Sequence, residues 1–301
     1  MKRRSWLFVP GSQKRMLEKA QTLPADVLII DWEDAVLASE KAAAREWTRQ
    51  LLESGVEREV YVRINGTDTP YIEADLASVV RPGLTGVMLP KAAEGTQLEA
   101  LDRALTREER KGGLSEGSLR VVPLIESAQG VLRAPELAGG PRVQALALGS
   151  VDLALNIGAR LTREGDELVY ARSQLVLISR AAGIEAPIDG VWLDVSDGEG
   201  LAEACRRVSN MGFQGKLAIH PGQLSAINDS FLPTEAEVEE AREVIRVYED
   251  SLHQGAGAVK VGSRMVDAPV VEQARRVLRQ VESTKILFDE KIGYSIRESE
   301  G

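Results

Sequence analysis

Two carboxylates stand at the ends of short apolar runs in the middle of the chain. Glu126 ends the run Val-Val-Pro-Leu-Ile-Glu, and Asp152 follows Ala-Leu-Ala-Leu-Gly-Ser-Val. A buried strand is expected to stop, and a loop to begin, at each point. With no cluster of His or Cys beside them, the pair predicts a hard, oxygen-only, incompletely filled metal site. Such a site suits Mg²⁺, with water and a chelating oxo-acid completing the shell, and it indicates an enzyme of carbonyl chemistry.

Other polar residues also follow apolar runs. They are Pro10-Gly11, Asp31-Trp32-Glu33-Asp34, Arg63-Ile64-Asn65, Lys91, Gly149-Ser150-Val151 and His220-Pro221. In a barrel of parallel strands these ends converge on one mouth, where active sites lie. Arg63 would present a planar fork of donors to a substrate oxygen, with Glu33 and Asp34 supporting it from behind. The backbone N–H groups of 149–151 could hold a carboxylate at the positive end of the following helix.

Each of these residues also has a purely structural interpretation. Glu126 and Asp152 could be solvated or capping carboxylates, with Asp152 as the N-cap of a helix over 153–157. Arg63 could form a structural ion pair with Glu33 or Asp34, which is compatible with binding substrate. His220 could be either a packed, hydrogen-bonded barrel residue or a ligand. His253 is expected on the surface of an exposed helix.

The spacing of apolar runs predicts the elements that must position these residues. Eight strands are expected at 5–9, 27–32, 59–64, 86–90, 121–126, 145–149, 188–193 and 216–220. Helical periodicity lies between them at 13–21, 39–53, 71–80, 95–105, 128–137, 166–182 and 198–211. Strict alternation implies right-handed βα units, and eight units favour closure. We therefore expect an α/β fold, a (β/α)8 TIM barrel over residues 1–230.

The chain continues past the eighth strand with residues 231–301, predicted as a C-terminal helical extension. Segment 234–254 is charged and amphipathic, 255–258 (Gly-Ala-Gly-Ala) is a flexible interruption, and 268–284 has the pattern of a further helix. The tail 285–301 is expected to fray. Because the barrel is already complete, this surplus is predicted to serve as a lid and an oligomer arm.

Composition narrows the class of protein. The 301 residues are 44% hydrophobic and 28% charged with a net charge of −9, which is typical of a soluble globular protein and disfavours nucleic-acid or membrane partners. The N-terminal apolar stretch is too short for a signal peptide and is interpreted as a strand. The one cysteine, Cys205, excludes an internal disulfide and fits a reducing, cytoplasmic location. We interpret it as a buried apolar filler. No nucleotide-binding glycine motif is present.

Several motifs together resemble the citrate lyase β-subunit-like (CitE-like) branch of the HpcH/HpaI aldolase superfamily. They are Arg4-Ser-Trp-Leu-Phe-Val-Pro-Gly, Ile30-Asp-Trp-Glu-Asp-Ala-Val with Lys41, Val62-Arg-Ile-Asn, Pro123-Leu-Ile-Glu-Ser, Leu148-Gly-Ser-Val-Asp, Pro187-Ile-Asp-Gly and Ile219-His-Pro-Gly-Gln. They occur in order across nearly the whole chain. The resemblance implies a Mg²⁺-dependent (β/α)8 barrel, a homotrimer or a multiple of it, acting on 3-hydroxyacyl-CoA thioesters such as citryl-, malyl- or citramalyl-CoA.

Carried over by position, the resemblance implies roles for individual residues. Glu126 and Asp152 match the metal ligands, and Arg63 matches the substrate-binding, charge-stabilising arginine. Asp267, in Met265-Val-Asp-Ala-Pro, matches a catalytic aspartate that reaches a neighbouring subunit's site. Two positions depart from the family pattern: Trp32 replaces a small aliphatic residue, and Asn156 stands where many members have a second aspartate.

The chemistry expected is cleavage or formation of a carbon–carbon bond through a thioester enolate, with an α-keto acid as the second partner. A malate or citramalate synthase, or a malyl-CoA thioesterase, would use the same site, and a citrate lyase β subunit would need an acyl-carrier partner. Pyruvate-dependent aldolases of the superfamily use an early histidine, whereas the first histidine here is His220. Lys14, Arg15 and Lys91 are candidate contacts for the phosphates of CoA, although a solvated face explains them equally well.

Overall fold

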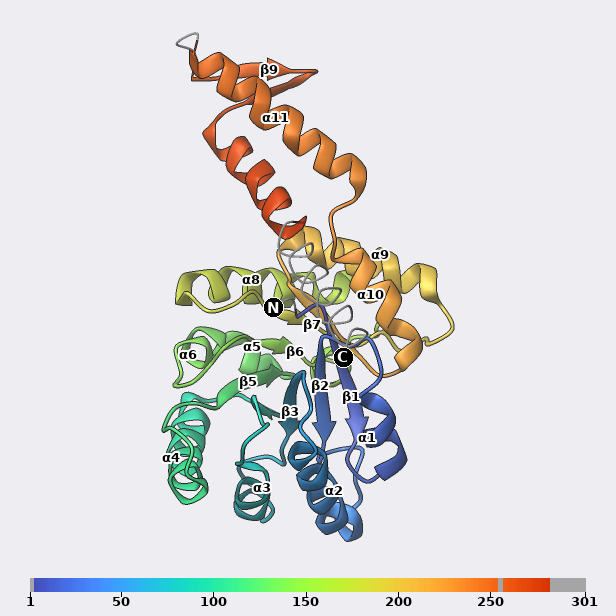
Figure 1. Cartoon of the computed structure of the whole chain (residues 1–301), viewed down its shortest axis with the longest axis vertical. Coiled ribbons are helices and arrows are strands. Elements are labelled where there is room, and N and C mark those ends of the chain that lie inside the picture. The colour runs from blue at the N-terminus through green and yellow to red at the C-terminus, as the bar shows by residue number, and fades with distance from the viewer. Residues whose placement is uncertain (1–2, 254–256, 282–301) are drawn as a thin grey trace, which may run out of the picture. The chain divides into compact units, whose positions relative to one another are not determined.

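Eight parallel strands close into a barrel in the order of the sequence, as predicted (Figure 1). The computed structural model describes residues 3–253 and 257–281. The strands are β1 Ser5–Pro10, β2 Val27–Asp31, β3 Glu59–Arg63, β4 Gly86–Leu89, β5 Arg120–Ile125, β6 Ala147–Leu148, β7 Ile188–Asp189 and β8 Gly215–Ala218. Because all strands are parallel, their carboxyl ends share one mouth, and the polar residues that follow them are brought to the same end.

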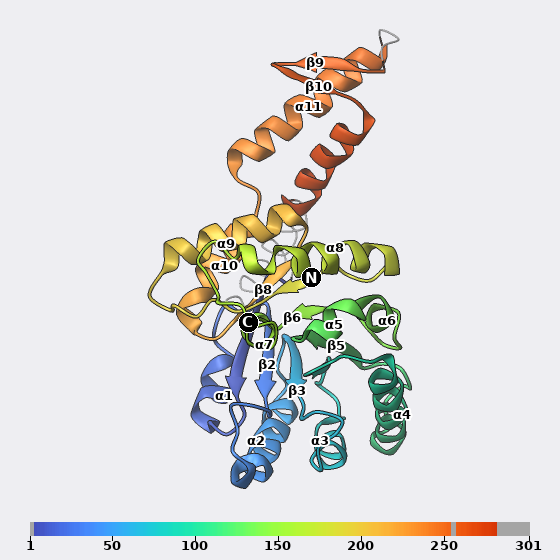
Figure 2. The same ribbon diagram turned by 180° about the vertical axis from the view of Figure 1, so that it is seen from behind.

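Helices surround the strands on the outside of the barrel (Figures 1 and 2). They are α1 Lys14–Ala20, α2 Lys41–Glu53, α3 Ile72–Val79, α4 Gly95–Gly112, α5 Ala128–Leu132, α6 Ala134–Ala138, α7 Ser150–Asn156, α8 Val169–Ala182, α9 Gly198–Met211 and α10 Leu224–Ser230. Short 3-10 turns occur at Ala38–Glu40, Asp166–Leu168 and Pro221–Gln223.

Two of the predicted helices differ from the sequence prediction, and α10 was not predicted. Helix α4 continues past residue 105 to a left-handed cap at Gly113 (φ 69°), because its last turns consist of strong helix formers such as Arg and Glu. The single helix predicted over 128–137 is two short helices. Pro135 lies at the start of α6, where its missing N–H cannot continue the ladder of α5.

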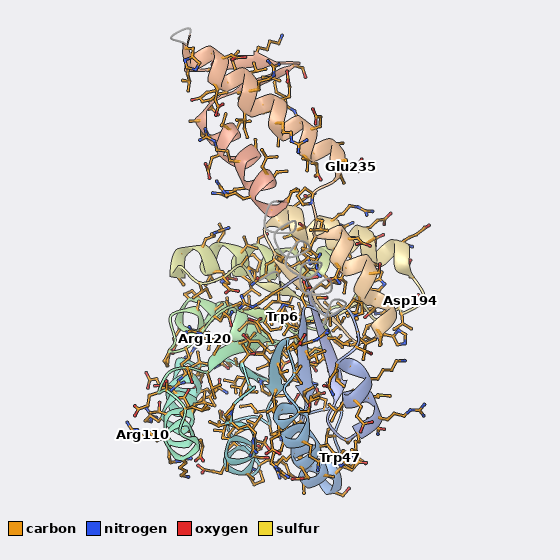
Figure 3. The ribbon with its side chains drawn as sticks, in the orientation of Figure 1. Trp6, Trp47, Arg110, Arg120, Asp194 and Glu235 are labelled. Atoms are coloured by element: carbon orange, nitrogen blue, oxygen red, sulfur yellow. The ribbon has the colours of Figure 1, made fainter. Side chains whose placement is uncertain are left out.

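The barrel buries both faces of its strands. In β2, Val27 and Ile29 belong to the cluster inside the barrel, whereas Leu28 and Ile30 belong to the larger cluster that includes residues of the surrounding helices. This alternation follows from the period of two in a strand. Trp6 of β1 fills the interior (Figure 3). The centroid of its ring lies 5.0 Å from that of Tyr61.

Ion pairs tie the first residues of the barrel to later strands. Arg3 binds Glu59 at the start of β3 and also donates to Glu185 at 2.8 Å, just before β7. Arg4 pairs with Asp26 at 2.8 Å, just before β2. Cys205 is buried in α9, which confirms its interpretation as a filler; burial raises the pKa of its thiol to about 12.

Beyond Phe231 the chain forms a second compact unit. It contains α11 Glu235–His253, the antiparallel pair β9 Val259–Val261 and β10 Arg264–Val266, and a helix over 268–281. Val266 packs in its core with Ala241, Val244, Val271 and Ala274. The predicted helical extension is confirmed, and it also contains a hairpin that was not predicted, formed by the alternating residues around Gly262 (φ 57°).

Some of the C-terminal predictions fall outside this description. Residue 254 of the predicted segment 234–254, residues 255 and 256 of the predicted interruption, the end of the helix over 268–284 and the tail 285–301 lie outside the described residues. Lid and oligomer-arm roles for this unit remain predictions. In the described part of the chain, no helix is both long and apolar enough to cross a membrane.

Candidate active site

A cavity of about 300 Å³ opens at the carboxyl ends of the barrel strands. It receives side chains from the ends of β1, β2, β3, β5, β6, β7 and β8. The lining residues are Phe8, Pro10, Asp31, Ala35, Arg63, Leu124, Glu126, Leu148, Gly149, Ser150, Val151, Asp152, Val191, Leu217 and Ile219. The cavity therefore brings together the predicted metal pair, the predicted arginine and the predicted backbone donors.

Glu126 and Asp152 come from neighbouring strands. Glu126 follows β5 and Asp152 lies in the first turn of α7, directly after β6, and these two strands pair at Ile125 and Leu148. Glu126 is 5% exposed, whereas Asp152 is exposed. Burial raises the pKa of Glu126 to about 7, a hydrogen bond from the Lys91 backbone opposes the shift, and the charge of Asp152 adds to it. The site therefore holds an excess of negative charge that a divalent cation would neutralise.

The residues around Glu126 leave room for its carboxylate only because position 149 is a glycine. A Cβ added to Gly149 would lie 2.5 Å from the Glu126 Cβ and 2.7 Å from its Oε2. Across the described residues, no three His, Cys, Asp or Glu side chains form a group able to hold a metal ion. A two-carboxylate, oxygen-only pair of this kind fits Mg²⁺, which keeps several water ligands.

Arg63 is buried and is held by a carboxylate that sequence reasoning did not single out. Its Nε and Nη2 donate to the two oxygens of Asp31 at 2.8 and 2.6 Å, and its Nη1 lies 3.1 Å from Glu33 and 3.4 Å from Asp34. Burial acts to lower the pKa of Arg63, but the bonds and charge of Asp31 outweigh it and raise the pKa. The ion-pair interpretation is thus correct, and Arg63 still lines the cavity.

Glu33 connects Arg63 with Lys91. Its Oε1 accepts from Lys91 Nζ at 2.6 Å, while its buried Oε2 forms the ion pair with Arg63 Nη1 at 3.1 Å. Burial raises the pKa of Glu33. Lys91 itself has a left-handed backbone (φ 50°), and its N–H donates to Glu126 Oε1 at 2.6 Å. Asp34 is exposed at the rim.

A buried lysine holds the loop that follows β2. Lys41 Nζ donates to the Trp32 carbonyl and to Asn65 Oδ1, both at 2.7 Å, so it joins the ends of β2 and β3. The Trp32 side chain is buried, and its Nε1 donates to Thr48 in α2 at 2.9 Å. Trp32 is not among the residues that line the cavity, and it packs in the larger cluster that includes residues of the surrounding helices.

Helix α7 begins at Ser150, so the alternative interpretation of Asp152 as the N-cap of a helix over 153–157 is wrong. Gly149 is the N-cap, and its N–H donates to the Ile125 carbonyl at 2.9 Å. The N–H groups of Ser150 and Val151 belong to the first turn, where a helix offers no internal acceptor. The Ser150 hydroxyl is buried and has no hydrogen-bond partner among the described residues.

The remaining candidates have structural roles or lie elsewhere. His220 Nδ1 accepts from Gly222 N at 3.1 Å and caps a 3-10 turn, and Asn156 Oδ1 accepts from Ala128 N at 2.9 Å at the start of α5. His253 is exposed at the end of α11. Asp267 belongs to the C-terminal unit, where its Oδ1 accepts from Val270 N at 3.4 Å. A short polar side chain before a helix is the signal for such a cap.

The fold and the cavity define an enzyme of the (β/α)8 class with a carboxylate pair at the mouth of its barrel. The chain belongs to the HpcH/HpaI aldolase/citrate lyase family, whose model matches residues 4–221. This finding confirms the resemblance seen in the sequence and the prediction of a lyase.

Three relatives illustrate the family. The chain is 35% identical to citrate lyase subunit beta of Haemophilus influenzae, over 93% of this chain and 97% of that protein. It is 36% identical to (3S)-malyl-CoA thioesterase of Cereibacter sphaeroides, over 93% and 95%. The crystal structure of CitE from Mycobacterium tuberculosis, in complex with magnesium, acetoacetate and coenzyme A, has 29% identity and a TM-score of 0.78, over 93% of this chain and 98% of that one.

Proposed function

We propose that the chain is a Mg²⁺-dependent carbon–carbon lyase that cleaves or forms a 3-hydroxyacyl-CoA thioester through a thioester enolate. Malyl-, citramalyl- and citryl-CoA are the substrates of this type. The observation that carries the proposal is the buried Glu126 beside Asp152 in a cavity that also contains Arg63. The magnesium in the related CitE structure supports the choice of metal.

Glu126 and Asp152 would hold the Mg²⁺, and the remaining positions would be filled by water and the keto acid. When bound, the metal supplies Lewis-acid polarisation of the keto-acid oxygens. The N–H groups of Ser150 and Val151 are the proposed contacts for the keto-acid carboxylate, whereas the predicted donor at Gly149 is already bonded to the Ile125 carbonyl. Those of Ser150 and Val151 point from the first turn of α7, whose positive end favours an anion.

Arg63 would donate to the thioester oxygen as negative charge develops on it in the enolate. Asp31, Glu33 and Asp34 fix the guanidinium before the substrate arrives, so the donors require little reorganisation. A preorganised donor of this kind contributes about 3 kcal/mol to transition-state stabilisation in comparable oxyanion sites. Glu33 and Asp34 thus support the site rather than take part in the reaction.

The base is the part of the proposal that lies outside the barrel. Asp267 would remove the proton from the thioester α-carbon in the condensing direction, and return it in cleavage. We propose that it acts in the site of a neighbouring subunit of a homotrimer, with the C-terminal unit as the lid. The supporting observation is that Asp267 is exposed and its carboxylate accepts a long hydrogen bond of 3.4 Å from the Val270 amide.

A second function is favoured by the relatives themselves. The citrate lyase β subunit and the malyl-CoA thioesterase match at nearly the same identity, 35% and 36%, so identity does not separate lyase, synthase and thioesterase. A synthase or a thioesterase would add water to the thioester after condensation. A citrate lyase β subunit would instead act on a thioester bound to an acyl-carrier partner.

The test is a product analysis. Purified protein with Mg²⁺ is given malyl-, citramalyl- and citryl-CoA, and the products are identified by mass. A lyase forms a shorter acyl-CoA and a keto acid, whereas a thioesterase releases free CoA and the hydroxy acid. A synthase releases CoA when acetyl-CoA and a keto acid are supplied together. Turnover of a carrier-bound thioester alone would assign the β-subunit role, and no turnover of any thioester would overturn the proposal.

A further inference from the structure

The cavity at the barrel mouth has a charge distribution that bears on its substrate. Nine of its lining residues have apolar side chains: Phe8, Pro10, Ala35, Leu124, Leu148, Val151, Val191, Leu217 and Ile219. Its charged residues are three carboxylates and one cation, Arg63. The carboxylates Glu126 and Asp152 are assigned above to the metal, and the third, Asp31, is bound to Arg63.

The cation of the cavity is already neutralised by protein. Arg63 is paired with both oxygens of Asp31 and lies within 3.4 Å of Glu33 and Asp34. The nearest further cation in this network, Lys91, is held by Glu33 at 2.6 Å. Within the described part of the barrel, the lining of this cavity therefore offers no uncommitted positive charge to a second substrate carboxylate.

A carboxylate that enters such a cavity without a partner loses its water and gains no ion pair. It would also be repelled by Asp31, and by any negative charge of Glu126 and Asp152 that the metal does not neutralise. An alkyl group or a hydrogen in the same place would instead contact Leu124, Leu148 or Leu217, which are all nearly fully buried. The cavity thus favours an apolar substituent on the keto acid.

We propose that this site selects 2-oxo acids whose carbonyl carbon bears a hydrogen or a small alkyl group, and disfavours those bearing a second carboxylate. The inference rests on the proposed function and assigns the substrate class of that site. In the condensing direction the thioester α-carbon loses its proton to a carboxylate base and bonds to the keto carbon. The carbonyl electron pair moves to oxygen, which takes up a proton. The products are malyl-CoA or citramalyl-CoA types rather than citryl-CoA.

Binding is the first measurement, because it needs no turnover. Calorimetric titrations at saturating Mg²⁺ compare pyruvate, 2-oxobutyrate and freshly dissolved oxaloacetate. We expect oxaloacetate to bind at least about tenfold more weakly than 2-oxobutyrate, in the range that one mismatched substituent produces. Equal or tighter binding of oxaloacetate, or binding of none of the acids, would overturn the inference.

A charge-introducing variant tests the cause. Ile219 lines the cavity and is 41% exposed, so Ile219→Arg places a guanidinium at the mouth without filling the core. The matched control is Leu177→Arg, on the exposed face of α8 and 71% exposed. We expect Ile219→Arg to shift the affinity ratio toward oxaloacetate by about tenfold or more and Leu177→Arg to leave it unchanged. An equal shift in both variants, or in neither, contradicts selection by local charge.

The condensation assay separates this inference from the function beneath it. With acetyl-CoA and Mg²⁺, glyoxylate and pyruvate should condense with a higher kcat/KM than oxaloacetate. If no oxo acid condenses but the binding preference holds, the lyase proposal fails and the selectivity of the cavity stands. If all condense and oxaloacetate is preferred, the lyase proposal stands and the selectivity is wrong.

Discussion

The backbone N–H of Lys91 donates to Glu126 Oε1 at 2.6 Å from a left-handed conformation (φ 50°). A non-glycine residue in that region carries a conformational cost of about 1 kcal/mol or more. The strain is located where it orients a proposed metal ligand. The loop after β4 therefore fixes one oxygen of Glu126, and the second oxygen remains for the metal.

Loss of either metal carboxylate should abolish Mg²⁺-dependent turnover while the fold survives. Glu126→Gln and Asp152→Asn keep the shape of each side chain and remove its charge. We expect both to lose at least about two orders of magnitude in kcat/KM, near 3 kcal/mol, with far-ultraviolet circular dichroism unchanged. Glu199→Gln is the control, since Glu199 is also exposed in the first turn of a helix. Retained activity at saturating metal in either variant would remove the assignment.

The raised pKa of Glu126, about 7, predicts that metal binding depends on pH. Because Mg²⁺ binds the carboxylate and not the acid, its apparent affinity should fall about tenfold per pH unit below 7. Titrations with Mn²⁺ as a spectroscopic probe at pH 6 and 8 measure this. An affinity that is constant over this range would show that Glu126 is not a ligand.

The same pKa predicts how the metal-free protein responds to pH. A carboxyl whose pKa is higher when folded stabilises the fold below its unfolded pKa of 4.5, and this contribution is lost as pH rises through about 7. The loss is on the order of 3 kcal/mol at 1.36 kcal/mol per pKa unit. Denaturant unfolding in a chelator should show it, and Glu126→Gln should flatten the curve. An unchanged slope in the variant would contradict the shift.

Arg63→Lys should not be conservative. A point charge cannot keep both bonds to Asp31 and still offer a donor to the substrate. We expect kcat to fall by one to two orders of magnitude, roughly 1.4–3 kcal/mol. Steady-state kinetics measure the change, and the melting temperature reports any structural part of it. Unchanged kinetics would leave Arg63 with a structural role alone.

Lys41→Met should destabilise the barrel through the loop after β2. The change leaves the Trp32 carbonyl and Asn65 Oδ1 without their buried donor, at a cost of about 1–3 kcal/mol for each unsatisfied group. Unfolding in denaturant measures it. Lys19→Met, on an exposed position of α1, is the matched control and should change stability by less than about 0.5 kcal/mol. Equal effects of the two variants would show that the buried donor contributes nothing specific.

Complementation tests whether Asp267 acts in a neighbouring site. Co-expressed Asp267→Asn and Glu126→Gln chains, each inactive alone, should regain part of the activity, because some mixed sites combine both intact residues. Differently tagged chains isolate the mixed oligomer for the assay. A mixed oligomer as inactive as its parents would show that Asp267 serves its own barrel or does no chemistry.

The barrel was predictable because each strand is an apolar run bounded by turn residues, and eight such runs alternate with helical patterns. The site followed from the same logic, since parallel strands end together. The pairing of charges across strands could not be predicted from the sequence. Asp31 binds Arg63 because β2 and β3 place them opposite each other in the register, and a register is a property of the folded sheet.

Two other differences had weak local signals. The hairpin at 259–266 has alternating Val residues around Gly-Ser, a recognisable strand–turn–strand pattern. The direction of the Trp32 side chain had no signal in the sequence, because a tryptophan at a strand end can face either the cavity or the helices. Its indole N–H found Thr48 in α2, a partner sixteen positions away that the spacing alone does not identify.

The closure of β1 onto β8 has a consequence for synthesis of the protein. Trp6 pairs with Leu217, so β1, which is synthesised before the other strands of the barrel, must wait for β8. Until then the apolar edge of β1 and the Val-Leu-Ile-Ile run of β2 belong to an open sheet, which is the kind of edge that associates with other chains. A nascent chain that stalls before Ala218 is thus a candidate for chaperone binding. Once β8 has been synthesised and released, it can pair with β1 and close the barrel.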